Sequence, residues 1–272
     1  MTGDTSNGNE AYVCPACRHR LRRDAGVLRC PTCYQAYPVA DGIPDFLREN
    51  LARSADPVLR RMRVIDRMAS IYESRLWYPV VLRLFGGSQS PSLEGLIEIA
   101  SADMQRISGR VLDVACGPGT FSRHVASSSR EVFGIDVSLG MLRQGARYTA
   151  KEGIRNVHFA CARVERLPFE DATFDATLCC GSLHLFADTV IALREMARVM
   201  KSGATLSVFT FGAGDGGILK FRRVREWYRR DQGLHVFEPA DLKGYLTAAG
   251  FTDFQPKRWG SVLTFSARKQ AE

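Results

Sequence analysis

The chain has 272 residues and a formal net charge of +8, with 45% hydrophobic and 24% charged residues, a composition typical of a folded protein and not of a disordered chain. No apolar run approaches the roughly 18 residues that a membrane-spanning helix needs, so we expect no membrane partner. Residues 1–11 show no secretory signal pattern and are expected to be disordered. We therefore expect a cytoplasmic location, where cysteines bind metals more often than they form disulfides.

The positive charge is unevenly distributed along the chain. The surplus of Lys and Arg over Asp and Glu is +1 in residues 1–60, +1 in 61–108, +2 in 109–211 and +4 in 212–272. A protein that binds along phosphates usually carries a strongly basic domain. The distribution therefore argues against nucleic acid as the main partner without eliminating it.

Residues 12–48 are predicted to form a zinc ribbon. Two Cys-Pro-x-Cys pairs, Cys14 with Cys17 and Cys30 with Cys33, supply four thiolates for one tetrahedral Zn²⁺. Four protein ligands leave no position for a catalytic water, so the metal would be structural and would stabilise a segment too short to fold alone. The alternative is four free or redox-active cysteines.

Residues 49–108 are predicted to be a helical linker. Apolar residues at three- and four-residue spacing predict a helix from about 56 to 85. A loop rich in Gly and Ser follows at 86–92, and a second helix extends to about 107.

The next segment has the pattern of a βαβ unit. A β-rich run at 110–115 leads into the glycine turn 116–120, a helix at 121–127 and a second strand at 131–136. This order predicts an α/β fold with a parallel sheet that binds ligands at the carboxyl ends of its strands. Asp113 is an unusual carboxylate for a buried strand and fits a cationic ligand; the alternative is a carboxylate satisfied by loop N–H groups.

From about 110 to 269 the chain resembles the class I S-adenosylmethionine-dependent methyltransferases of the broad type 11 branch. The resemblance lies in four short motifs: Val-Leu-Asp-Val-Ala-Cys-Gly-Pro-Gly-Thr at 111–120, Gly-Ile-Asp-Val-Ser at 134–138, Leu-Pro-Phe at 167–169 and Phe-Asp-Ala at 174–176. It extends to residues 193–203, which resemble the helix and turn before the fifth strand, and to residues 238–251, which resemble the last helix. It implies a doubly wound Rossmann-like sheet over 109–272, mostly parallel with an antiparallel last strand. It also implies that the linker 49–108 caps the cofactor and substrate, and that a lid is inserted at about 212–234.

The resemblance also implies a set of cofactor-binding residues. Asp113, Ala115, Gly117 and Gly119 would line the methionine moiety, Asp136 would bind the ribose hydroxyls, and Val137 and Met141 would pack on the adenine; Cys116, Arg163, Val164 and Cys180 complete the expected site. Arg163 departs from the family, because relatives usually carry Asp there, near the adenine amino group. A backbone carbonyl or stacking by the arginine would then replace that carboxylate.

The candidate base is a histidine near the cofactor. His184 follows the predicted fourth strand and is the first candidate, and His235, at the end of the lid, is the second. For each, a structural role is the alternative. The expected substrate and lid residues are Tyr72, Tyr78, Phe221 and Arg225, where packing or a solvated basic helix face is the competing explanation.

The sequence therefore predicts an enzyme that methylates a small organic molecule, by O-methylation of an enol or hydroxyl group in specialised metabolism. The acceptor could be anionic or carrier-linked, and the protein a monomer or homodimer. The apolar run Cys-Gly-Ser-Leu-His at 180–184, which lacks the Asn/Asp-Pro-Pro-aromatic motif of many base-methylating enzymes, favours this over guanine N-methylation in ribosomal RNA. Methylation of a carbon atom in a small molecule and a non-catalytic role are also compatible with the sequence.

Overall fold

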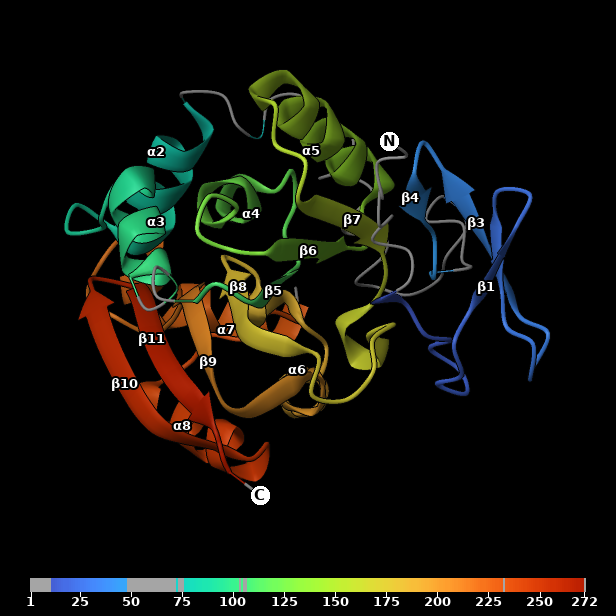
Figure 1. Ribbon diagram of the computed structural model, residues 1–272. Helices are drawn as coiled ribbons and strands as arrows, with labels where there is room; N and C mark the ends of the chain where they lie inside the picture. Colours follow the sequence, from blue (N-terminus) through green and yellow to red (C-terminus); the bar gives the residue numbers. More distant parts are fainter. Residues whose placement is uncertain are drawn as a thin grey trace.

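The computed structural model describes residues 11–47, 72, 76–102, 104, 107–231 and 233–271. Two β-sheets organise them: a small N-terminal sheet and a seven-stranded sheet that carries most of the chain (Figure 1). In these ranges, no helix has the length and apolar character needed to cross a membrane.

The small sheet has four antiparallel strands in chain order, β1 (Arg22–Asp24), β2 (Val27–Arg29), β3 (Ala36–Ala40) and β4 (Ile43–Pro44). Ala25 and Gly26 join the first two strands, and both have positive φ. This is the conformation that a tight two-residue hairpin turn requires. The turn expected from Asp24-Ala25-Gly26 is therefore present.

The large sheet has the strand order β10-β11-β9-β8-β5-β6-β7 (Figure 1). Its strands are β5 (Arg110–Val114), β6 (Glu131–Asp136), β7 (Val157–Cys161), β8 (Phe174–Cys180), β9 (Met200–Phe211), β10 (Phe251–Trp259) and β11 (Val262–Lys269). The pairs from β9 to β7 are parallel, and the last strand, β11, is antiparallel to both of its neighbours. The predicted doubly wound sheet with an antiparallel last strand is confirmed.

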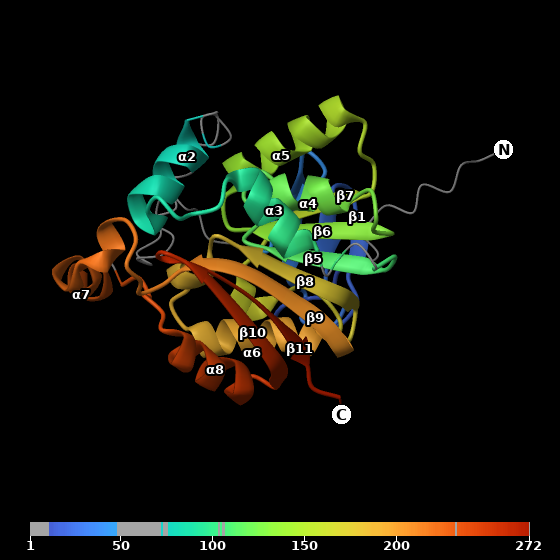
Figure 2. The ribbon, with the colours of Figure 1, turned by 90° about the vertical axis from the view of Figure 1, so that its left-hand side faces the viewer.

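Helices cover both faces of this sheet. Figure 2 shows α3 (Leu93–Ser101), α4 (Thr120–Val125) and α5 (Leu139–Glu152) on one face, and α6 (Thr189–Val199) and α8 (Pro239–Ala248) on the other. Ser138 and Asp188 begin α5 and α6 by accepting hydrogen bonds from backbone N–H groups three residues later. The two faces bury separate apolar cores against the central strands β5 and β8.

The segment before the sheet is less regular than expected. Of the helix predicted at about 56–85, residues 56–71 and 73–75 lie outside the described residues. The remainder forms α2 (Trp77–Val81) and a wider π-helical turn, η2 (Leu82–Gly86). The second helix, α3, ends at Ser101, before the expected end near 107.

The small sheet packs against the edge of the large one at β7 (Figure 1). Asp45 forms a parallel β-bridge with Cys161, the last residue of β7. The next residue, Phe46, donates its N–H to the Cys161 carbonyl at 2.8 Å. The buried ring of Tyr12 contacts Phe133 and Phe169 of the large domain. The four-cysteine segment is therefore part of the same folded body as the sheet.

After β9 the chain leaves the sheet and forms two short helical segments. These are the 3-10 turn η5 (Ile218–Lys220) and α7 (Arg222–Asp231). Tyr228 of α7 packs its ring against Phe85 of η2 at 5.8 Å between centroids. The predicted lid insertion thus contacts the segment that precedes the sheet.

Candidate cofactor and acceptor site

The glycine turn after β5 builds the floor of the site. Ala115, Gly117 and Gly119 all have positive φ, so the chain turns sharply before α4 begins. A Cβ on Gly119 would lie 2.8 Å from the Phe159 ring, which explains why glycine is required there.

A pocket opens beside this turn, at the carboxyl ends of β5 and β6. Its wall combines apolar side chains with one carboxylate from β6, Asp136, and a charged pair after β7. The residues that line it are Tyr72, Val114, Ala115, Gly117, Ile135, Asp136, Val137, Met141, Ala162, Arg163, Val164, Glu165, Gly181, Ser182, Leu185 and Phe186. This is the position where open α/β sheets bind nucleotides.

Seven of the expected cofactor residues line this pocket: Ala115, Gly117, Asp136, Val137, Met141, Arg163 and Val164. Four others, Asp113, Cys116, Gly119 and Cys180, do not line it. Gly119 shapes the turn from outside the pocket, and Cys116 is buried under that turn.

Asp136 holds the glycine turn while facing the pocket. One carboxylate oxygen accepts the Gly117 N–H at 2.9 Å, and the other accepts the Ser138 N–H at 2.8 Å. A carboxylate in this position can also accept hydrogen bonds from the hydroxyls of a ribose. The residue therefore fits the role that the resemblance implies for it.

Asp113 is buried behind the turn. The Ser122 hydroxyl donates to its carboxylate at 2.6 Å. Burial raises the pKa of the Asp113 carboxyl to about 7, although the Ser122 hydrogen bonds oppose this shift. Asp113 is thus satisfied by Ser122 of α4, not by the loop N–H groups considered as the alternative, and it does not line the pocket.

The pocket wall after β7 contains a carboxylate that the sequence motifs did not indicate. Arg163 replaces the Asp common in relatives, but Glu165, two residues later, lines the same wall. Its carboxylate pairs with the Arg163 guanidinium at 3.3 Å. A carboxylate acceptor is thus available without the expected residue, and its displacement by two positions is why motif matching overlooked it.

The two candidate histidines lie close together but outside the pocket wall. His184 is on the 3-10 turn η4 (Leu183–Leu185), whose Leu185 lines the pocket. The His184 Nδ1 atom lies 3.2 Å from the Thr210 hydroxyl, and the His184 carbonyl accepts the His235 N–H at 2.9 Å. Thr210, a buried residue next to the last residue of β9, was not expected to have a role.

An aromatic wall leads from His184 to the lid. The His184 ring packs edge-on against Phe211, with 5.4 Å between ring centroids. The Phe211 ring lies 5.6 Å from the Phe85 ring, which in turn contacts Tyr228. The ring of His235 stacks on Phe237, and its Nε2 atom lies 3.4 Å from the Ala187 carbonyl. His184 therefore adjoins an apolar wall continuous with the lid, whereas His235 packs away from it.

The expected substrate residues fall into two groups. Tyr72 lines the pocket, and the ring of Tyr78 packs edge-on against it at 5.5 Å. Phe221 is exposed on the lid, and the Arg225 guanidinium donates to the carbonyls of Leu219 and Lys220 within its own segment. Tyr72 therefore lies in the pocket wall with Tyr78 packed behind it, whereas Phe221 and Arg225 do not line the pocket.

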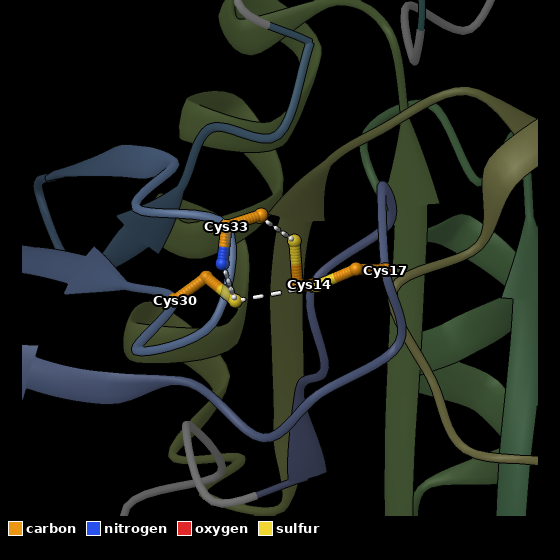
Figure 3. A group of neighbouring side chains, drawn as sticks. All are labelled: Cys14, Cys17, Cys30 and Cys33. Atoms are coloured by element: carbon orange, nitrogen blue, oxygen red, sulfur yellow. Dashed lines mark hydrogen bonds between the residues drawn. The ribbon is translucent and has the colours of Figure 1, made fainter.

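The four cysteines of the ribbon converge on one point (Figure 3). Their sulfur atoms all lie within 4.8 Å of one another, with Cys14–Cys33 at 3.5 Å and Cys17–Cys30 at 3.3 Å. Four sulfurs at about 2.3 Å from one Zn²⁺ would be separated by about 3.8 Å, so the cluster fits a tetrahedral zinc ion. The thiolate donor set and the closed geometry match structural zinc.

Comparison with known proteins agrees with this geometry. The methyltransferase domain family matches residues 111–203, and the Trm112p-like protein family matches residues 13–42. An uncharacterized chloroplastic methyltransferase of Arabidopsis thaliana is 25% identical over 96% of this chain and 78% of its own length. The demethylmenaquinone methyltransferase of Corynebacterium urealyticum is 40% identical over 59% of both chains, and the malonyl-[acyl-carrier protein] O-methyltransferase of Pseudescherichia vulneris is 31% identical over 57% of this chain and 61% of its own.

Solved structures share the fold at low sequence identity. Phosphoethanolamine N-methyltransferase 2 of Haemonchus contortus, in complex with S-adenosyl-L-methionine, has a TM-score of 0.58 at 16% identity, covering 75% of this chain and 60% of its own. The [4+2]-cyclase SpnF has a TM-score of 0.57 at 21% identity, covering 76% of this chain and 96% of its own.

The fold and these matches agree on a methyltransferase domain that includes residues 111–203. A Trm112p-like segment with four converging cysteines precedes it in the chain.

Proposed function

We propose that the protein transfers a methyl group from S-adenosylmethionine to a hydroxyl or enol oxygen of a small, largely apolar organic molecule. The observation that carries the proposal is a pocket at the strand ends whose floor is held by Asp136, with His184 and an aromatic wall beside it. We assign residues 12–48 to the ribbon, 49–108 to the cap and 109–272 to the catalytic core. The curated relatives with the higher identities span only part of this chain, and they support the class of substrate but not its name.

The cofactor would bind along the carboxyl ends of β5 and β6. Asp136 would accept the ribose hydroxyls, Val137 and Met141 would contact the adenine, and Glu165 would accept a hydrogen bond from its amino group. S-adenosylmethionine, when bound, supplies a methyl group on a sulfonium centre, which an aligned nucleophile can attack. The enzyme's main task is to hold the two reactants in line and to exclude water.

The acceptor would lie between the cofactor and the aromatic wall. Tyr72, Leu185 and Phe186 exclude water from the pocket side. The Thr210 hydroxyl beside Nδ1 orients the His184 ring, so that it could remove the proton of an acceptor hydroxyl as the oxygen attacks. In this mechanism His184 is the general base and Thr210 is a positioning residue.

Titration calorimetry with S-adenosylmethionine tests the cofactor assignment. Wild-type protein is expected to bind it, and Asp136→Ala to bind about 10- to 100-fold more weakly, because charge-assisted hydrogen bonds are lost. His184→Ala should bind within about twofold of wild type, since His184 lies outside the pocket wall. Failure of the wild-type chain to bind the cofactor would contradict the proposal.

Turnover of a panel of phenols and quinols tests the base. Measured as S-adenosylhomocysteine formed, kcat should fall about 10²- to 10⁴-fold in His184→Ala, the range for a general base. The matched control is His124→Ala, an exposed histidine of α4, which should retain wild-type turnover. Equal rates in the two variants would remove His184 as the base.

Methylation of a ring carbon is the second candidate. It is supported by the 40% identity to a demethylmenaquinone methyltransferase over 161 residues. Nuclear magnetic resonance of a product labelled with a ¹³C methyl group separates the two, because a methyl on oxygen and a methyl on carbon have distinct chemical shifts. A methyl on carbon would replace the O-methylation proposal.

A further inference from the structure

A ridge of apolar side chains lies exposed on the segment before α3. Leu76 immediately precedes α2, Val80 lies in α2 and Leu84 lies in η2. Their spacing of four residues places them on one side of this segment. Their exposed fractions are 75%, 58% and 46%. Folding within the chain leaves this face largely open to solvent.

The lid adds two aromatic side chains beside this ridge. Phe221 is 54% exposed and Trp227 is 48% exposed, whereas Val224 and Tyr228 of the same helix turn inward and pack on the core. A shallow groove between the two segments is lined by Val80, Leu84, Ile218 and Phe221, among others. Figure 2 shows α2 and α7 at the same end of the molecule.

Cations surround these aromatic residues. Between residues 220 and 230 the chain carries six Lys and Arg against Glu226 alone. Arg222 pairs with Glu226 at 3.2 Å, and Arg225 bonds backbone carbonyls. In the part of the chain that the structure describes, no ion pair involves Arg223, Arg229 or Arg230, and all three are exposed. These three arginines therefore have no acidic ion-pair partner among the described residues.

We infer that this face docks on an anionic lipid surface, with Phe221, Trp227 and the Leu76–Leu84 ridge entering the headgroup boundary and the lid arginines contacting lipid phosphates. A helix with cations on one side and Trp, Phe or Leu on the other lies in the membrane interface without crossing it. Single exposed apolar residues are ordinary. Here Val80, Leu84 and Phe221 line one groove, and Leu76 and Trp227 are exposed on the same two segments, close in sequence to the lid cations, which indicates an interaction site.

An acidic protein partner would satisfy the cations but leaves the apolar ridge without a comparable role. The lipid surface accounts for both features. It revises the expectation, drawn from the absence of a spanning segment, that no membrane is a partner. It is independent of which atom accepts the methyl group.

Co-sedimentation of the full chain with lipid vesicles tests the inference. The protein should bind vesicles that contain phosphatidylglycerol and bind pure phosphatidylcholine vesicles far less. Each surface cation contributes about fivefold to the partition constant, so Arg229→Gln with Arg230→Gln should lower it about 10- to 30-fold. Phe221→Ser with Trp227→Ser should lower it at least about 10-fold even at low salt, because apolar contact is lost.

Matched variants in the ribbon control for charge and for exposed aromatic surface. Arg22→Gln with Arg23→Gln removes two exposed cations, and Tyr34→Ser removes an exposed ring. Both should bind vesicles within about twofold of wild type. Equal decreases of the partition constant in the lid and ribbon variants would overturn the proposal. A partition constant left unchanged by the Phe221 and Trp227 substitutions would overturn it too. Retention by a soluble acidic carrier protein together with no binding to phosphatidylglycerol vesicles would overturn it as well.

Discussion

Gly119 shows how closely the cofactor turn depends on one side chain. Its φ of +74° and the Phe159 ring at 2.8 Å from a built Cβ both oppose any larger residue. Gly119→Ala should destabilise the protein by about 2–4 kcal/mol, because backbone strain and a steric clash add. The unfolding midpoint in thermal denaturation measures this.

Gly153 provides the matched control for that substitution. It has nearly the same φ, +72°, at the end of α5, but a Cβ there would meet nothing within 4 Å. Gly153→Ala should therefore cost only about 1 kcal/mol, the strain of the left-handed conformation. Equal shifts of the two midpoints would refute the clash with Phe159.

Asp113 makes the stability of the fold depend on pH. Its folded-state pKa, raised to about 7 by burial, exceeds the ordinary value of 3.8, so the folded protein holds the proton more tightly than the unfolded chain. The stability that Asp113 contributes through this tighter proton binding is fully present below about pH 4 and is lost as the pH rises through about 7. Asp113→Asn, which cannot ionise, should remove this dependence.

Urea denaturation of wild type and Asp113→Asn at pH 5 and pH 8 measures the effect. The free energy of unfolding of wild type relative to the variant should fall by a few kcal/mol, to order of magnitude, between these two pH values. The Ser122 hydroxyl can still donate to the asparagine oxygen, so the packing is retained. A difference that stays constant with pH would rule out a titrating Asp113.

The ribbon is an element whose folding depends on four thiols. Cys14→Ser removes one ligand from the cluster, and a segment with so small a core cannot compensate. We expect about one zinc per wild-type chain, loss of most of it in the variant, and faster proteolysis within residues 11–47. Cys179→Ala, a buried cysteine outside the cluster, should retain the zinc. Elemental analysis and timed proteolysis decide between these outcomes.

The elements of the core were predictable because their patterns are local. The glycine turn, the flanking strands and the Asp24–Gly26 hairpin each occupy a short run in which spacing determines backbone geometry. The place of Glu165 in the pocket wall, the contact of Thr210 with His184 and the hydrogen bond from Ser122 to Asp113 depend on how separate elements pack, and no periodicity encodes that. The direction of the Arg225 side chain is likewise a tertiary choice, because a helical wheel cannot show that its guanidinium turns back to the carbonyls of Leu219 and Lys220.

At the scale of the whole molecule, we expect the ribbon and the sheet to unfold as one cooperative unit. Tyr12 is buried among Phe46, Phe133 and Phe169, which belong to both parts. Tyr12→Ala should cost about 3–5 kcal/mol and lower the melting temperature of the entire chain in a single transition. Tyr34→Ala, at an exposed ring of the ribbon, should change the free energy of unfolding by about 0.5 kcal/mol or less. Two separate transitions in calorimetry would show that the parts unfold independently.

The position of β4 beside β7 has a further consequence for how copies of the protein meet. An open sheet has two edge strands whose unpaired backbone groups can recruit a strand from another molecule. The ribbon occupies one edge, where Asp45 and Phe46 pair with Cys161. The other edge, β10, carries Pro256, Lys257 and a break in register between Thr252 and Gln255, all of which resist strand addition. Concentrated solutions should therefore stay free of edge-to-edge polymers as long as the zinc cluster keeps the ribbon folded.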